Sequence, residues 1–411
     1  LPWLALLGLG ACATGTAPTD PSRAPLPVLL MPTPPADPVP YTGAPAVILA
    51  GGTVMTAAGD VFSPGHVVLR GGRIVAVGPG AAAASGGATV IDANGTFITP
   101  GIIDTHSHMG VYALPAVSAH EDGNEMTRPN TADVWAEHAF WPQDPALFRA
   151  VAKGGVTSLQ VLPGSGNLIG GRSFVAKLRP QTSARLMRFP GAPQGLKMAC
   201  GENPKRVYGS KGSFPMTRMG NVAGYRKAFQ EALEYRRRWQ KYERDLETWK
   251  RDHAKDSDNA DDPPDPPDRD FALETLVAVL DGDILVQNHC YRADEMHIML
   301  DLAQEFGFQI RSFHHGLEAY KLRDRLVMEG VAVSTWAVSW GFKLESFDGI
   351  PQNAALLAQA GVTTVIHSDS ETEVCHLNQE AAKAVAAGHK IGVEVTDNQA
   401  LRWITANPAW V

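Results

Sequence analysis

The sequence predicts an α/β fold, a (β/α)8 barrel of the TIM type with a small β-sheet domain before it, and three observations support this. After Gly101, short apolar strand-like segments alternate with amphipathic or polar stretches. Counting the segment that begins at Ile102 there are eight of them, the strand number of such a barrel. The chain has 411 residues, 44% of them hydrophobic, which is enough for a barrel and a smaller companion domain.

Residues 1–45 read as a signal-like segment followed by a proline-rich tether. The apolar run that starts at Leu1 ends just before Cys12, as in a bacterial lipoprotein signal, and is too short to span a bilayer, which needs about 20 apolar residues. Ten of the 30 prolines lie between Pro18 and Pro45, as in an extended tether. We therefore expect a lipid anchor at Cys12 and export to the periplasm or cell envelope, with a ragged hydrophobic terminus as the alternative.

Residues 46–100 are expected to form the small β domain. Short apolar runs are separated there by Gly-Gly and Asn-Gly pairs, which is typical of hairpins in an antiparallel sheet. Such a sheet usually needs partner strands to cover its other face, and the sequence stops at Val411 without supplying them. The sequence therefore suggests a fragment of a longer chain.

The barrel is expected over residues 101–411, with one interruption. After the strand at Ile102, its strands are predicted in VTSLQVLPG, SFVAKLRP, LKMACG, DILVQNHC, FQIRSFHHG, VAVSTWAV and TTVIHSDS. Between the fourth and fifth, a charged insertion at about 221–270 combines a long charged helical pattern with an acidic, proline-rich stretch. A solvated helix and loop is favoured there over a partner-binding arm.

Composition excludes some classes of function. A net charge of −7 provides no basic surface for nucleic acid, so no nucleic-acid partner is expected. The four cysteines (Cys12, Cys200, Cys290 and Cys375) are widely scattered and form no CxxC pair. They indicate neither a thiolate zinc site nor a disulfide framework.

The strongest chemical signal is PGIIDTHSHMG, in which His106 and His108 are two residues apart on the first barrel strand. Residues i and i+2 of a strand face the same side, so both imidazoles can reach one cation. Two structural histidines are the alternative, but an apolar strand offers two buried imidazoles no hydrogen-bond partners. The pair therefore predicts a metal site at the barrel mouth.

This segment is similar to the signature of the amidohydrolase superfamily, close to its imidazolonepropionase-like and prolidase-like branch, and the resemblance covers most of residues 46–410. It implies a carboxylated lysine or a glutamate on strand four, histidines on strands five and six, and an aspartate on strand eight. His289, His315 and Asp369 match the last three positions. His314 should point away from the site by strand alternation if His315 points in.

Lys197 in LKMACG resembles the strand-four lysine that related enzymes convert to a carbamate bridging two metals. An unmodified ammonium pointing at a cation would be disfavoured, so Lys197 is either carboxylated or turned elsewhere. Glu202 and, less favoured, Lys177 are the alternative bridges. One or two divalent ions, with zinc expected, are implied.

The resemblance also assigns roles in catalysis. Asp369 would touch the metal and move a proton to the leaving nitrogen, with His315 beside it and His367 orienting the substrate or the aspartate. A helix N-cap is the alternative for Asp369. Substrate contacts are expected from residues near strand ends, with surface or core positions as the alternative; these candidates are Arg172, Lys205, Arg206, Tyr208, Arg292, Trp336 and Trp340.

The resemblance thus implies a metal-dependent hydrolase that cleaves a C–N bond in an amide, cyclic amide or dipeptide with metal-activated hydroxide. Its expected partner is a small molecule or dipeptide, and an oligomer is compatible with this interpretation. The alternatives are a mononuclear deaminase or imidazolonepropionase-type ring hydrolase, and a non-catalytic metal-binding lipoprotein.

Overall fold

The structure is a computed structural model that describes residues 43–83, 86–254 and 261–411. The predicted signal-like segment, Cys12 and nearly all of the tether lie outside these residues. Within them, no helix combines the length and apolar character needed to cross a membrane.

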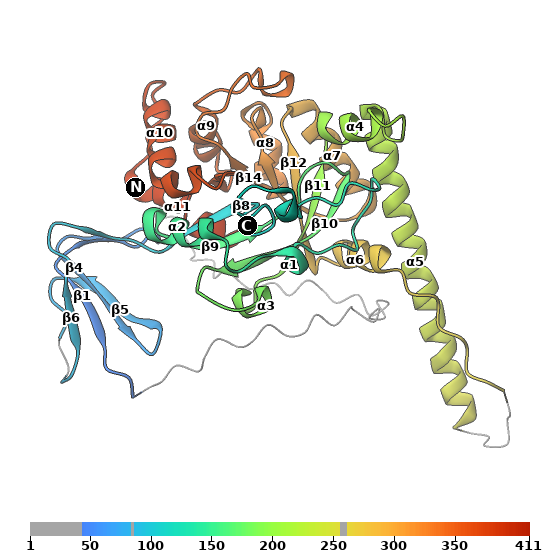
Figure 1. Cartoon of the computed structure of the whole chain (residues 1–411), viewed down its shortest axis with the longest axis horizontal. Helices are drawn as coiled ribbons and strands as arrows, with labels where there is room; N and C mark the ends of the chain where they lie inside the picture. The colour runs from blue at the N-terminus through green and yellow to red at the C-terminus, as the bar shows by residue number, and fades with distance from the viewer. Residues whose placement is uncertain (1–42, 84–85, 255–260) are drawn as a thin grey trace, which may run out of the picture.

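The predicted eight-stranded barrel is confirmed (Figure 1). Its sheet has the spatial order β15-β14-β13-β12-β11-β10-β9-β8. The strands are β8 (Ile102–Ser107), β9 (Val156–Val161), β10 (Ile169–Lys177), β11 (Gln194–Ala199), β12 (Ile284–Cys290), β13 (Ile310–His315), β14 (Ala332–Thr335) and β15 (Thr364–Ile366).

Strand β10 departs from the predicted all-parallel arrangement, because it runs antiparallel to both β9 and β11. The chain between β9 and β10 covers only residues 162–168, whereas a parallel crossover needs about a dozen residues or more. The connection to β11 carries only the short helix α3 (Ala184–Met187). Because the connection from β9 to β10 has no crossover helix, β10 runs in the opposite direction to β9.

The first and last strands, β8 and β15, are joined by backbone contacts at both ends. At the carboxyl end, Asp369 donates its N–H to the carbonyl of His106 at 3.0 Å. Lower down, Ile103 donates to Ile404 at 2.9 Å and Ile366 donates to Trp403 at 3.0 Å. Residues 403–404 therefore fill the gap between the two strands and complete the barrel.

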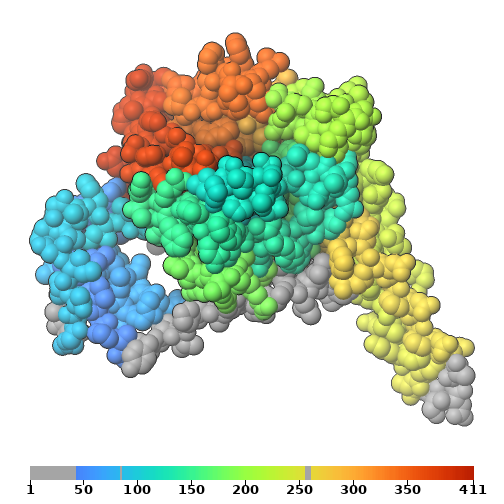
Figure 2. All heavy atoms as spheres, in the orientation of Figure 1, coloured from blue at the N-terminus to red at the C-terminus, as the bar shows by residue number. Residues whose placement is uncertain are grey.

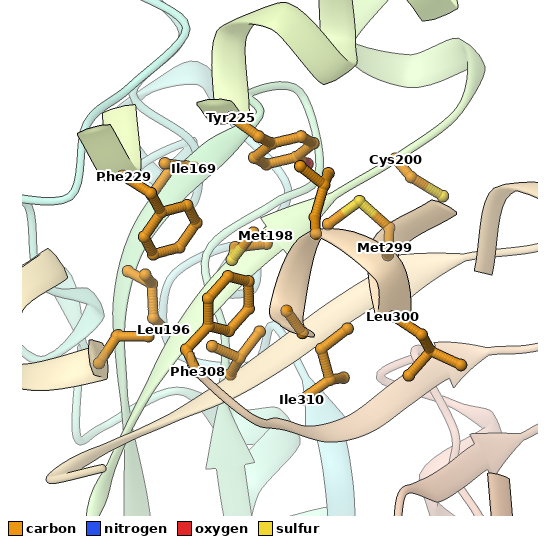
Figure 3. Packing of buried hydrophobic residues seen from close by; sticks show 14 of the residues in the cluster. Ile169, Leu196, Met198, Cys200, Tyr225, Phe229, Met299, Leu300, Phe308 and Ile310 are labelled. Atoms are coloured by element: carbon orange, nitrogen blue, oxygen red, sulfur yellow. The ribbon is translucent and has the colours of Figure 1, made fainter. Parts of the chain in front are cut away.

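Helices cover the outside of the barrel (Figure 1). They are α1 (Ala136–Ala139), α2 (Pro145–Gly154), α3, α4 (Glu202–Gly209), α5 (Arg218–His253), α6 (Phe271–Leu280), α7 (Ala293–Phe306), α8 (Arg323–Glu329), α9 (Asn353–Ala360), α10 (Leu377–His389), α11 (Asp397–Arg402) and α12 (Ala406–Trp410). Short 3-10 turns occur at Ser118–His120, Ala319–Lys321, Leu344–Ser346 and Glu373–His376. Figure 3 shows part of one core cluster, where Leu196 and Ile310 from the strands lie with Phe229 and Met299 from α5 and α7.

Helix α5 is not the fully solvated insertion that its charge predicts. Its N-terminal two thirds bury Tyr225, Phe229, Tyr235 and Trp239 in the core. These residues recur at helical spacing, so a narrow apolar stripe is hidden among charged neighbours. The C-terminal part of the helix projects away from the barrel (Figures 1 and 2) and is the predicted solvated helix.

Two small sheets lie before the barrel, inside the predicted boundaries of 46–100. Their strands are β1 (Val47–Ala50), β2 (Thr53–Met55), β3 (Val61–Phe62), β4 (Gly65–Arg70), β5 (Arg73–Pro79), β6 (Thr89–Asp92) and β7 (Phe97–Ile98). The sheet orders are β5-β4-β1-β6 and β3-β2-β7. Neither is purely antiparallel as expected, because β6 pairs in parallel with β1 and β7 with β2.

The structure corrects the expectation that no disulfide is present, because Cys200 and Cys290 are bonded, with their Cα atoms 5.3 Å apart. Ala199 of β11 pairs with His289 of β12, so the two cysteines follow a register pair on neighbouring parallel strands. A separation of 90 residues conceals this proximity in the sequence. The disulfide links the carboxyl ends of β11 and β12 at the barrel mouth.

Candidate active site

His106 and His108 lie at the carboxyl end of β8, the end at which barrel enzymes place their catalytic groups. Their Nε2 atoms are 3.6 and 3.4 Å, respectively, from the same oxygen of Asp369, Oδ1. Two ligands about 2.1 Å from one tetrahedral ion lie roughly 3.4 Å apart. The spacing of these three side chains therefore fits a single cation.

A second group overlaps the first. His106, His315 and His367 each offer a ligand atom within 4.8 Å of the others, so His106 belongs to both groups. His367, expected to orient substrate or Asp369, is therefore also placed as a candidate ligand. Neither ring nitrogen of His367 has a hydrogen-bond partner among the described residues, and neither does Nδ1 of His315. Buried polar atoms without partners are costly, and a bound cation would satisfy them.

His289 lies beside this cluster. Its ring centroid is 4.6 Å from that of His315, and its Nε2 is 3.4 Å from Nδ2 of Asn203. The two ligand groups do not include it. His289 thus reaches the site, as expected, but through a contact with another histidine.

Lys197 points into the cluster from β11. Its side chain is 1% exposed, and its Nζ lies 3.3 Å from Nε2 of His106. Burial lowers the pKa of Lys197 from 10.5 to about 8, although the charge of Asp369 opposes this shift. The neutral amine, the form that reacts with CO2, is therefore accessible near neutral pH.

The two alternative bridges lie elsewhere. Lys177 pairs with Ser158 near the start of β9, because β10 is reversed, and so lies at the end of the barrel opposite the mouth. Glu202 begins α4, where Oε1 is 3.7 Å from Nζ of Lys343. Glu202 belongs to neither ligand group.

Two site residues adopt a left-handed backbone conformation, with φ of 72° at His315 and 52° at Asp369. Such angles are uncommon outside glycine and concentrate at functional sites. The turn at His315 breaks strand alternation, which corrects the expectation for His314. Instead of pointing away, His314 places its Nδ1 2.9 Å from Nδ1 of His106.

Electrostatics at Asp369 follow from its position. Burial raises the pKa of this carboxyl from 3.8 to about 7, while the nearby charge of Lys197 lowers it. A carboxyl whose pKa lies close to neutral is suited to accept and release a proton at that pH.

Sequence reasoning missed Asp104. Its fully buried carboxylate accepts from the N–H of His106 at 3.1 Å and from the N–H of Ser368 at 3.2 Å. Burial raises its pKa to about 6. The available signal was its place two residues before His106, on the same strand face as the two histidines.

Aromatic rings flank His315. Trp336, an expected substrate contact, stacks on it with centroids 4.3 Å apart and donates Nε1–H to the carbonyl of Ser368. Tyr291 stacks on it at 5.0 Å, and Nζ of Lys343 lies 3.8 Å from the centroid of the Tyr291 ring. Neither Tyr291 nor Lys343 was predicted, and no sequence pattern marks Lys343. Trp340 is 63% exposed on the loop after β14.

The structure does not place two of the expected substrate contacts at the site. Arg172 is buried on the outside of the barrel and donates to Thr275 and Gln194. The Tyr208 hydroxyl donates to the Arg128 carbonyl.

The Arg292 guanidinium makes two hydrogen bonds to Asp294, at 2.9 and 2.7 Å. Arg206 is exposed on α4; burial lowers the pKa of Lys343, and the charge of Arg206 adds to this. Lys205 is half-buried on the same helix. Their roles toward substrate stay predictions.

No family model matches the chain. It is 34% identical over 313 residues to "Amidohydrolase tasK" of Hapsidospora irregularis, a match that covers 73% of this chain and 31% of that protein. The chain therefore spans about a third of the length of this relative. The crystal structure of an amidohydrolase from Thermotoga maritima MSB8 is 31% identical, with a TM-score of 0.75 and 88% of each chain covered. With this likeness in sequence and fold over most of its length, the chain belongs to the amidohydrolase superfamily.

Proposed function

We propose that this protein is a metal-dependent hydrolase that cleaves a C–N bond in an amide, cyclic amide or dipeptide. The observation that carries the proposal is the convergence of His106, His108 and Asp369, from the first and last barrel strands, at distances that fit one cation. Both relatives described above are named amidohydrolases, which supports an amide-type bond.

The residues present fit one or two divalent ions, with zinc as the expected metal. His106, His108 and Asp369 would hold one ion. Because the one free ring nitrogen of His106 binds a single ion, a second ion would be held by His315 and His367, with His289 beside them. When bound, such an ion lowers the pKa of a water molecule and polarises a carbonyl group. The unpartnered nitrogens of His315 and His367 support this fit.

Lys197 is proposed to become a carbamate. Its neutral amine would form an N–C bond to CO2 and release a proton, which replaces a cation with an anion between the two ligand groups. This removes the repulsion between an ammonium and a metal ion. Its burial, and its position 3.3 Å from Nε2 of His106, support the assignment.

The chain's own groups supply the proton transfers and the orientation. Asp369 would take a proton from the attacking water and deliver it to the departing nitrogen. The Nδ1 of His108 lies 2.8 Å from the Leu162 carbonyl, which can only accept, so Nδ1 carries the hydrogen and Nε2 is free to bind. Trp336 and Tyr291 provide an apolar flank beside His315 for a small-molecule or dipeptide substrate.

Export to the cell envelope is proposed as well. The Cys200–Cys290 disulfide supports it, because such bonds persist mainly in oxidising compartments. The lipid anchor at Cys12 remains part of this proposal and lies outside the described residues.

The test is a screen of the zinc-loaded protein against dipeptides, N-acyl amino acids and cyclic imides. For any substrate found, Asp369→Asn should lower kcat by about 100-fold or more, and His106→Ala should abolish turnover. Asp324→Asn, an exposed aspartate on α8, is the matched control and should leave kcat unchanged. Undiminished turnover in Asp369→Asn would contradict the proton-transfer role. One metal per chain, with release of ammonia, would favour a mononuclear deaminase instead.

A further inference from the structure

We infer that His314 and Gln287 form a hydrogen-bonded relay behind His106 that fixes its ring in the tautomer presenting Nε2 to the cation site. Nδ1 of His106 lies 2.9 Å from Nδ1 of His314, and Nε2 of His314 lies 2.7 Å from Oε1 of Gln287. All three side chains are 1% exposed or less. The inference rests on the proposed function only in that a cation binds at His106.

The order of donors and acceptors follows from the last member of the relay. Nε2 of Gln287 lies 3.2 Å from the Val411 carbonyl oxygen, which can only accept a hydrogen bond. The amide nitrogen of Gln287 must therefore face Val411, and its Oε1 must face His314. Because Oε1 also only accepts, Nε2 of His314 carries the hydrogen.

The same logic reaches His106. Both rings are fully buried beside the cation site, where a charged imidazolium is disfavoured, so each is neutral and carries one N–H. Nδ1 of His314 is then an acceptor, and Nδ1 of His106 must supply the hydrogen between them. The lone pair of His106 is left on Nε2, the atom 3.3 Å from Nζ of Lys197 and 3.6 Å from Oδ1 of Asp369.

His106 depends on this relay in a way that the other candidate ligands do not. His108 is oriented by a backbone carbonyl, and Nδ1 of His315 and both ring nitrogens of His367 lack partners among the described residues. His106 also belongs to both ligand groups. Loss of the relay should therefore weaken binding at whichever group His106 joins, which makes His314 and Gln287 positioning residues for the site.

The test compares the affinity of the full chain for zinc, by competition with a chromogenic chelator, across matched variants. His314→Phe keeps the ring volume without an acceptor, and Gln287→Leu removes the end of the relay. Each should weaken zinc binding about 10- to 100-fold. His314→Asn offers an amide oxygen to Nδ1 of His106 and should recover most of the affinity. Asn288→Leu removes a neighbouring buried amide that has no hydrogen-bond partner among the described residues, and it should leave affinity unchanged.

Affinity within about twofold of the wild type in a folded His314→Phe variant would overturn the relay. So would equal losses in His314→Phe and His314→Asn, which would indicate packing alone. If the variants do not fold, nitrogen-15 NMR of the wild-type imidazoles decides, because His106 with its hydrogen on Nε2 contradicts the relay. Zinc binding without hydrolysis of any tested substrate would count against the proposed function and leave the relay standing.

Discussion

Replacing His367 with asparagine should change how the stability of the metal-free protein depends on pH. The His367 side chain is 1% exposed, and burial, followed by the charge of Lys197, lowers its pKa from 6.5 to about 3. Between these two values the unfolded chain binds a proton that the folded chain does not. The contribution of His367 to stability is therefore complete above pH 6.5 and is lost as the pH falls toward 3.

The size of the effect follows from these two pKa values. Lowering the pH from 7 to 5 should reduce the free energy of unfolding by about 1.9 kcal/mol through this one group. The asparagine variant lacks that contribution and keeps the other titrating groups. Between pH 7 and pH 5, the unfolding free energy of the variant relative to that of the wild type should thus increase by about 1.9 kcal/mol.

Urea unfolding in EDTA at pH 7 and pH 5, followed by far-UV circular dichroism, measures this difference. His376→Asn is the matched control, because it removes an exposed imidazole outside the barrel mouth. An unchanged difference between wild type and His367→Asn at the two pH values would refute the reasoning. It would mean that the folded protein accommodates a proton on His367 as readily as the unfolded chain does.

Two further predictions concern buried charges. In zinc-loaded protein, the peptide that contains Lys197 should carry the added mass of one CO2 under non-acidic mass spectrometry, and that of Lys177 should not; an unmodified Lys197 at full metal loading would contradict the carbamate. Arg188→Met should lower the free energy of unfolding by about 3–5 kcal/mol, because it leaves the buried carboxylate of Glu137 without its partner. Urea unfolding midpoints measure this loss of stability. If the Arg188→Met, Glu137→Leu double variant loses as much stability as Arg188→Met, the unpaired carboxylate of Glu137 is not the cause.

The fold could be predicted because its signals are local and repeated. Each barrel strand is an apolar run, and eight such runs at barrel spacing leave few alternative architectures. The reversal of β10 follows from the short connection between β9 and β10. That length can be read from the sequence, but the regular repeat of apolar runs suggested parallel strands throughout. The Cys200–Cys290 disulfide was not predictable by spacing, because only the register of β11 with β12 brings the two cysteines together.

The same distinction applies to the candidate site: positions set by a strand end could be predicted, whereas contacts between residues distant in sequence could not. Residues that end parallel strands, such as His289, His315 and Asp369, reach the mouth because the carboxyl ends of the parallel barrel strands all lie there. Two of the expected substrate contacts are not placed at the site, because each side chain already has a partner distant in sequence. Arg172 donates to Thr275, and the Tyr208 hydroxyl donates to the Arg128 carbonyl. A charged or hydroxyl group near a strand end is therefore weak evidence of a substrate contact until its partners inside the fold are known.

The position of Asp104 explains why the first and last strands form one site. Its carboxylate accepts from the backbone of both His106 and Ser368, and the N–H of Asp369 donates back to the carbonyl of His106. His106 is thus held at its backbone N–H, at its carbonyl and, through His314, at its ring. These contacts stabilise the uncommon backbone angle of Asp369 without any contribution from a cation. Because they are already made, the ligands would bind metal with little rearrangement, as a preorganised site requires.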